Sequence, residues 1–215
     1  MPDLGILFFY YKQNDPVSDQ NLESWRRHNP DLPVIPVFCS HPDQPWPEKH
    51  PTLYSWRNCD LNLYYWYDQP RSVDCARWLY VEWDAYCNLP AREFLRMVWD
   101  KDVAAASVKF LSRDPEWEWF EEVKMLPPAA QPLACGVSPF ACTMLSDRAL
   151  AAVANTFFSE RWQVFCELRL ATMAHLNGYA PVANPLAGPM VTWRQLHPED
   201  VNGPGIYHSV KFMLR

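Results

Sequence analysis

Two apolar segments flank one amphipathic segment in the first forty residues. Residues 4–11 are apolar almost throughout, which is typical of a strand covered on both faces of a parallel sheet. Ser18 or Asp19 can cap a helix that extends to about His28, and residues 34–39 predict a second strand. The chain therefore begins with a β-α-β unit, for which a right-handed parallel crossover is expected.

The most informative pattern is the segment Trp78-Leu-Tyr-Val-Glu-Trp-Asp84, which predicts a buried strand that ends in two acids. Because side chains alternate along a strand, Glu82 and Asp84 are expected on the same face, about 6–7 Å apart. In α/β sheets, ligands bind beyond the carboxyl ends of the strands. Two carboxylates there suit a hard divalent cation, which prefers oxygen ligands. The alternative is that the acids only mark where the strand reaches water.

Strands and helices continue to alternate downstream. The further predicted helices are 60–67, 90–99, one that begins near Asp114, 147–157 and 161–177, and the further predicted strands are 102–110 and 140–145. This order predicts an α/β fold, in which a single doubly wound, mostly parallel sheet carries helices on both faces. We expect one domain over residues 1–215, with residues 178–215 as a loop-rich tail that closes over the site.

Composition excludes several classes of protein. The net charge of −6 argues against nucleic-acid binding, which needs a basic face. The seven cysteines include no Cys-x-x-Cys pair, so a zinc site is not expected. The chain lacks the glycine-rich phosphate motifs and the Gly-x-Ser-x-Gly elbow, which removes the standard dinucleotide, P-loop and α/β-hydrolase interpretations. Without a signal peptide or an apolar span, a cytoplasmic protein with no transmembrane segment is expected.

Three segments together resemble nucleotide-sugar-dependent glycosyltransferases of the GT-A type. They are the opening unit of residues 4–39, the sequence Leu79-Tyr-Val-Glu-Trp-Asp-Ala85, and the sequence Gly205-Ile-Tyr-His-Ser-Val-Lys211. The second is similar to the Asp-x-Asp signature of that superfamily, with Glu82 in place of the commoner Asp. The third is similar to the C-terminal histidine loop of several such families. The resemblance implies a GT-A-like fold and transfer of a sugar from a nucleotide-diphosphate donor to an unknown acceptor.

The resemblance also implies a role for several side chains. Mn²⁺ or Mg²⁺ would neutralise the diphosphate leaving group, with Asp84 as a direct ligand and Glu82 acting through water or the ribose. His208 is the candidate third ligand, and Lys211 is a candidate contact of the phosphates. An ordinary loop histidine and a solvated lysine are the alternatives, and the Glu82 departure leaves open a re-aimed metal ion or a metal-free relative.

Glu167 is the candidate catalytic base. It is an acid inside the apolar stretch 164–170, and a buried carboxylate would have a raised pKa and could accept the proton of an acceptor hydroxyl. An ion pair on a helix surface is the alternative interpretation. An enzyme that retains the anomeric configuration would not need this base.

Weaker predictions concern binding of the donor and the acceptor. The candidates for the nucleoside are Tyr10, Tyr11 and Ser40, those for the sugar or ribose are Asn58, Asp60 and Asp68, those for the diphosphate are Arg71 and Arg77, and one of Trp117 and Trp119 is expected in an acceptor groove. Two other functions remain open. A nucleotidyltransferase shares the sheet and the metal, although residues 12–16 lack the glycines of its usual loop. A catalytically inactive module of the same fold would bind a sugar or a partner.

Overall fold

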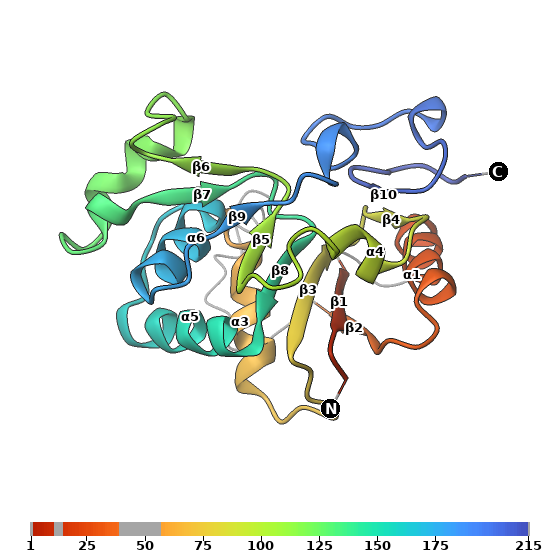
Figure 1. Ribbon diagram of the computed structural model, residues 1–215, viewed down its shortest axis with the longest axis horizontal. Coiled ribbons are helices and arrows are strands. Elements are labelled where there is room, and N and C mark those ends of the chain that lie inside the picture. Colours follow the sequence, from red (N-terminus) through yellow and green to blue (C-terminus); the bar gives the residue numbers. More distant parts are fainter. Residues whose placement is uncertain (1, 11–14, 39–56, 215) are drawn as a thin grey trace.

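A six-stranded sheet forms the centre of the computed structural model, which describes residues 2–10, 15–38 and 57–214 (Figure 1). In spatial order its strands are β2 (Val34–Phe38), β1 (Gly5–Tyr10), β3 (Arg77–Glu82), β8 (Thr143–Ser146), β5 (Val103–Ala105) and β9 (Val182–Ala183). Among these strands β8 runs antiparallel to its neighbours and the others run parallel to one another. The predicted α/β fold with a mostly parallel sheet is therefore confirmed.

Helices cover both faces of this sheet, as the sequence predicts. The helices are α1 (Pro16–His28) and α4 (Ala91–Leu95) on one face, and α3 (Cys59–Asp68), α5 (Asp147–Glu160) and α6 (Cys166–Leu176) on the other. Alternation along β1 separates the two cores. Ile6 and Phe8 pack in the core that contains Trp25 of α1, whereas Leu7 and Phe9 pack in the core of the other three helices.

Helix caps explain where α1 and α5 begin. The Asp15 carboxylate accepts a hydrogen bond of 2.8 Å from the backbone N–H of Ser18, and Pro16 occupies the first turn. The cap of α1 is therefore Asp15, and the prediction of Ser18 or Asp19 is wrong because the proline begins the helix earlier. Ser146 caps α5 as predicted.

Residues 102–110 form two short strands, although the sequence predicts one. After β5 the chain leaves the central sheet, and β6 (Val108–Phe110) pairs with β7 (Cys135–Val137) in a separate two-stranded ribbon. The apolar pattern of the segment cannot show which strands its two halves pair with, because the partner strands lie much later in the sequence. The segment after Asp114 is also different, since it forms a 3₁₀ helix, η1 (Glu118–Met125), instead of an α-helix. The predicted helix 90–99 is α-helical only over α4.

The tail folds back toward α1 and the end of β3 (Figure 1). It contains two 3₁₀ helices, η3 (Gly188–Met190) and η4 (Pro198–Asp200), and the strand β10 (Ile206–Tyr207). β10 pairs antiparallel with β4 (Tyr86–Cys87). The backbone N–H of Val210 donates to the carbonyl of Asp84 at 2.7 Å, and that of Leu214 donates to Oε1 of Gln20 at 2.6 Å. The tail is thus fixed beside the acids that follow β3. In the described part of the chain, no helix has the length and apolar character needed to span a membrane.

Candidate metal centre

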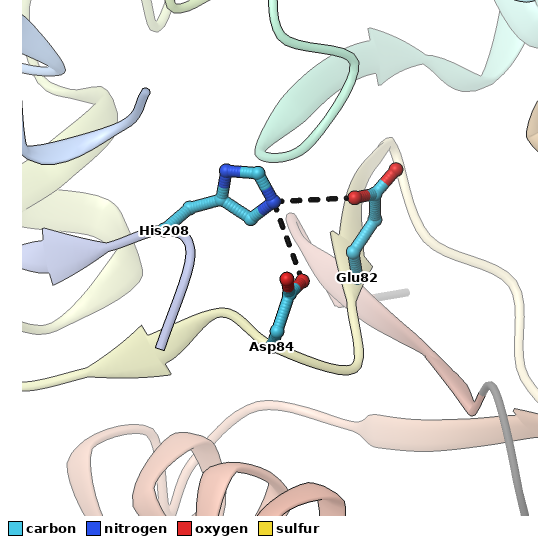
Figure 2. A group of neighbouring side chains, drawn as sticks. All are labelled: Glu82, Asp84 and His208. Carbon is cyan, nitrogen blue, oxygen red and sulfur yellow. Dashed lines mark hydrogen bonds and ion pairs between the residues drawn. The ribbon is translucent and has the colours of Figure 1, made fainter. Parts of the chain in front are cut away.

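Glu82 and Asp84 meet at the carboxyl end of β3, but a turn and not a strand brings them together. The strand ends at Glu82, and the backbone N–H of Ala85 donates to the carbonyl of Glu82 at 3.0 Å. The expected strand alternation through Asp84 is therefore wrong. The turn still directs both carboxylates to one place, because each lies 3.3 Å from the same nitrogen of His208 (Figure 2).

His208 reaches the two acids from the tail, 126 residues from Glu82 in sequence. Its Nδ1 lies 2.7 Å from the carbonyl oxygen of Thr192, and a carbonyl can only accept, so Nδ1 carries the hydrogen. In the neutral ring Nε2 is then a lone-pair donor directed at the acids, which is the arrangement of a metal-binding histidine. The three ligand atoms lie within 4.8 Å of one another.

Without a metal ion, the charges of the cluster shift the pKa values of His208 and Asp84. Burial lowers the pKa of His208, but the negative charges of Asp84 and Glu82 outweigh burial and raise it to about 10. Burial likewise raises the pKa of Asp84, yet His208, Ser209 and Lys211 together lower it to about 2. A cation bound here would take the place of the proton on Nε2, because a histidine ligand must be neutral.

The donor set fits a divalent cation. Asp84 is 3% exposed; its Oδ2 accepts a hydrogen bond of 2.5 Å from Ser209 and lies 3.5 Å from Nζ of Lys211. Its Oδ1 is buried and has no hydrogen bond among the described residues. Two carboxylates and an imidazole nitrogen form a mixed oxygen and nitrogen donor set that could hold a divalent cation.

Asn21 of α1 joins the two segments that carry the cluster, and sequence reasoning did not single it out. Its side chain is fully buried, and Nδ2 donates to the carbonyl of Trp83 at 3.0 Å and to the carbonyl of Val210 at 3.2 Å. One amide thus ties the acid-bearing turn to the histidine-bearing tail. A polar residue in an amphipathic helix predicts a solvated face, so the sequence holds no signal for this role.

Glu167, the candidate base, lies in the first turn of α6 and is fully buried. Both carboxylate oxygens are buried, and no ion pair with them is found among the described residues, which excludes a surface ion pair. Burial raises its pKa well above the ordinary value, and the charge of Glu82 raises it further, while a hydrogen bond from the backbone of Phe140 and the charge of His208 lower it.

Comparison with known proteins identifies a similar fold. Sixteen chains of solved structures match. One of them is a glycosyltransferase involved in the glycosylation of the major capsid of PBCV-1, with a TM-score of 0.54 and 12% sequence identity over 99% of this chain and 95% of that chain. The fold of this chain is similar to the fold of that protein. No family model and no curated protein sequence matches it.

The other predicted site residues are spread over both ends of the sheet. Arg77 begins β3, whereas Glu82 ends it, so about 16 Å of extended chain separates them. Arg71 pairs with Asp74 and stacks 4.2 Å over the ring of Tyr67, near the start of α5. The structure therefore does not bring Arg71 and Arg77 to the cluster, because Arg71 precedes β3 and Arg77 begins it, whereas the acids lie at its far end.

The remaining candidates have the following surroundings. Tyr10 ends β1, and its hydroxyl donates a hydrogen bond of 3.1 Å to Asp19. Asn58 precedes α3 and accepts a hydrogen bond of 3.0 Å from Arg169, and Asp68 is exposed at the end of the same helix. Nζ of Lys211 lies 5.7 Å from the centre of the Trp83 ring. Tyr11 and Ser40 lie outside the described residues. The ring of Trp117 lies against Gly136, and Trp119 stacks on Phe165 at 3.9 Å, while both tryptophans stay partly exposed.

Asp60 is fully buried and forms an ion pair with Arg169, in which Nε donates to Oδ2 at 2.8 Å and Nη2 contacts Oδ1. The same guanidinium donates to the carbonyls of Trp162 and Val164. This pair fixes the first turn of α3 to α6, the helix that carries Glu167. The structure thus gives Asp60 a scaffold contact instead of a place beside the cluster.

Replacing Arg169 by Leu should destabilise the fold by about 3–5 kcal/mol, because the charge of Asp60 would stay buried without its partner. Urea denaturation would measure the loss. The control is Arg148→Leu, which removes the pair between an exposed arginine and Asp102 and should cost much less, because solvent screens that pair. Equal losses in the two variants would contradict a special role for the buried pair.

Proposed function

We propose that this protein is a metal-dependent glycosyltransferase that moves a sugar from a nucleotide-diphosphate donor to an acceptor hydroxyl. Glu82, Asp84 and His208 hold the divalent cation, Mn²⁺ or Mg²⁺. Glu167 is the general base, and Lys211 is placed beside Asp84 to meet a phosphate oxygen. One observation carries the proposal: two carboxylates and a histidine nitrogen converge at the carboxyl edge of a parallel sheet whose fold matches a glycosyltransferase.

The chemistry assigns a separate task to each part of the cluster. A divalent cation, when bound, neutralises the charge that develops on the departing diphosphate. Asp84 and Glu82 supply negative charge to hold the ion, and Thr192 keeps His208 in the tautomer that can bind it. Lys211 is half-exposed and free to turn from Asp84 toward an incoming phosphate.

Glu167 completes the reaction on the acceptor side. Its carboxylate takes the proton of the acceptor hydroxyl while that oxygen forms the new bond to the anomeric carbon, and the nucleoside diphosphate leaves with the bonding electron pair. A direct displacement of this kind inverts the anomeric configuration. A buried carboxylate without an ion-pair partner costs stability, and a module that only binds a sugar would have no use for it. This feature favours the enzyme over the inactive module.

Titration calorimetry with uridine and guanosine diphosphates tests the proposal. In the presence of Mn²⁺ one of them should bind, and the corresponding monophosphate should bind more weakly because it offers fewer oxygens to bridge to the cation. Chelation of the metal should abolish binding. Absence of binding with and without metal would overturn the proposal. Release of free sugar from a nucleotide-sugar would then separate an enzyme from a binding module.

A further inference from the structure

Trp193 stands out among the exposed apolar side chains because its ring is held in place. It is 48% exposed, and its Nε1 donates a hydrogen bond of 2.9 Å to Oγ of Ser138. Exposure alone would not single it out, since isolated apolar residues are common on protein surfaces. A hydrogen-bonded indole, however, keeps a large flat surface in a fixed position at little further cost in conformational entropy.

The ring connects the two halves of the proposed active site. Its neighbour in sequence, Thr192, supplies the carbonyl that holds Nδ1 of His208 at 2.7 Å. Its hydrogen-bond partner, Ser138, directly follows β7. That strand packs on the helix of Glu167, where Thr172 exchanges hydrogen bonds with the backbone of Cys135 at 3.2 and 3.0 Å. Trp193 therefore lies on the segment that positions a metal ligand and contacts the segment that supports the base.

This position suits the acceptor better than the donor. In the proposed reaction the diphosphate of the donor occupies the carboxylates at the end of β3, while the acceptor hydroxyl has to reach Glu167. Trp193 is hydrogen-bonded to the residue that follows β7, the strand that packs on the helix of Glu167, and so lies on the acceptor side of the proposed site. An indole face is flat and apolar with one polar edge, and a sugar ring offers the matching combination of a C–H face and peripheral hydroxyls.

We propose that Trp193 is a stacking platform for a sugar ring of the acceptor, so that the acceptor is a carbohydrate. This inference rests on the function proposed above. Covering the exposed part of the indole removes apolar surface from water, which stabilises the complex in proportion to the area covered. The hydrogen bond to Ser138 fixes the plane of the ring and therefore the direction from which the acceptor enters.

The test uses Trp193→Ala and Trp193→Phe with a panel of methyl glycosides and disaccharides as probes. Binding is measured by saturation-transfer NMR and fluorescence titration, and the Mn²⁺-dependent affinity for nucleoside diphosphate is measured on the same preparations. We expect Trp193→Ala to weaken saccharide binding roughly tenfold and Trp193→Phe to restore most of it. Met97→Ala removes another exposed apolar side chain, 58% exposed, and is the control.

Each other outcome has a distinct meaning. Unchanged saccharide affinity in Trp193→Ala overturns the inference, and so does a change in nucleotide affinity alone, which would place the ring against the donor base. Failure of every saccharide to bind a protein that still binds Mn²⁺ and nucleotide overturns the carbohydrate acceptor and leaves the proposed function intact. If the unaltered protein does not bind nucleotide, the proposed function is overturned. Saccharide binding that depends on Trp193 would still show a saccharide site in that case.

Discussion

Replacing Asp84 by Asn should abolish the metal-dependent binding of nucleoside diphosphate while the fold survives. The substitution keeps the size of the side chain and its contact with Ser209, but it removes the charge that sits 3.3 Å from Nε2 of His208. Loss of partners that only orient a ligand typically costs 10–100-fold in metal affinity, so loss of a ligand itself should cost more than about 100-fold. Calorimetric titration with Mn²⁺ and the diphosphate measures this change.

Asp100→Asn is the matched control for this experiment. It makes the same chemical change in a side chain that is 75% exposed and paired with Lys101. Circular dichroism of both variants would show that the sheet is retained. Unchanged Mn²⁺ affinity in Asp84→Asn would mean that the cation binds elsewhere, which would contradict the proposed metal site and the transferase function inferred from it.

Replacing Glu167 by Gln should lower the rate of sugar transfer by about 10²–10⁴-fold, the usual contribution of a general base, with metal and nucleotide binding retained. The unaltered enzyme should lose activity as the pH falls through the raised pKa of Glu167, since the base must be ionised, and this loss should begin well above the ordinary value of 4.5. The variant should lack this dependence. Glu23→Gln, at an exposed position of α1, is the control.

The same substitution should stabilise the metal-free protein. A carboxyl group whose pKa is raised in the folded state destabilises that state as the pH rises from 4.5 through the folded pKa, because the unfolded chain ionises more readily. Glutamine has no such penalty, so its thermal midpoint should exceed that of the unaltered protein at pH 8 and approach it at pH 4. If Glu167→Gln were fully active, or if its activity depended on pH in the same way as that of the unaltered protein, the base would have to be another residue.

The parts of the fold that depend on neighbouring residues could be predicted from the sequence. The continuous apolar runs of β1 and β2 and the amphipathic α1 between them are local patterns, and the parallel pairing of Ile6 with Val34 follows from the crossover rule. The cap at Ser146 is likewise local. Glu82 and His208 were predicted as partners from a resemblance, and the structure places them 3.3 Å apart.

The features that escaped prediction depend on contacts between distant segments. Whether Val108 pairs in the central sheet or in a ribbon depends on residues 135–137, about thirty positions later. Arg77 has the composition of a phosphate ligand, but its place at the start of β3 removes it from the site. Asn21 looks like a surface residue until the carbonyls of the tail are known. Charge and residue type alone therefore could not separate the site from the scaffold.

Glu82 of β3 and His208 of the tail are 126 residues apart in sequence. Because both belong to the proposed metal centre, binding of a metal ion would be coupled to docking of the tail against the sheet. An ion that prefers the closed arrangement contributes its binding free energy to the docking of residues 190–210 against the sheet. In its absence these residues should undock more often than the strands beneath them, and their amide protons would exchange with solvent first. The exchange rates of the amide protons in this segment would therefore report whether the proposed site holds a metal ion.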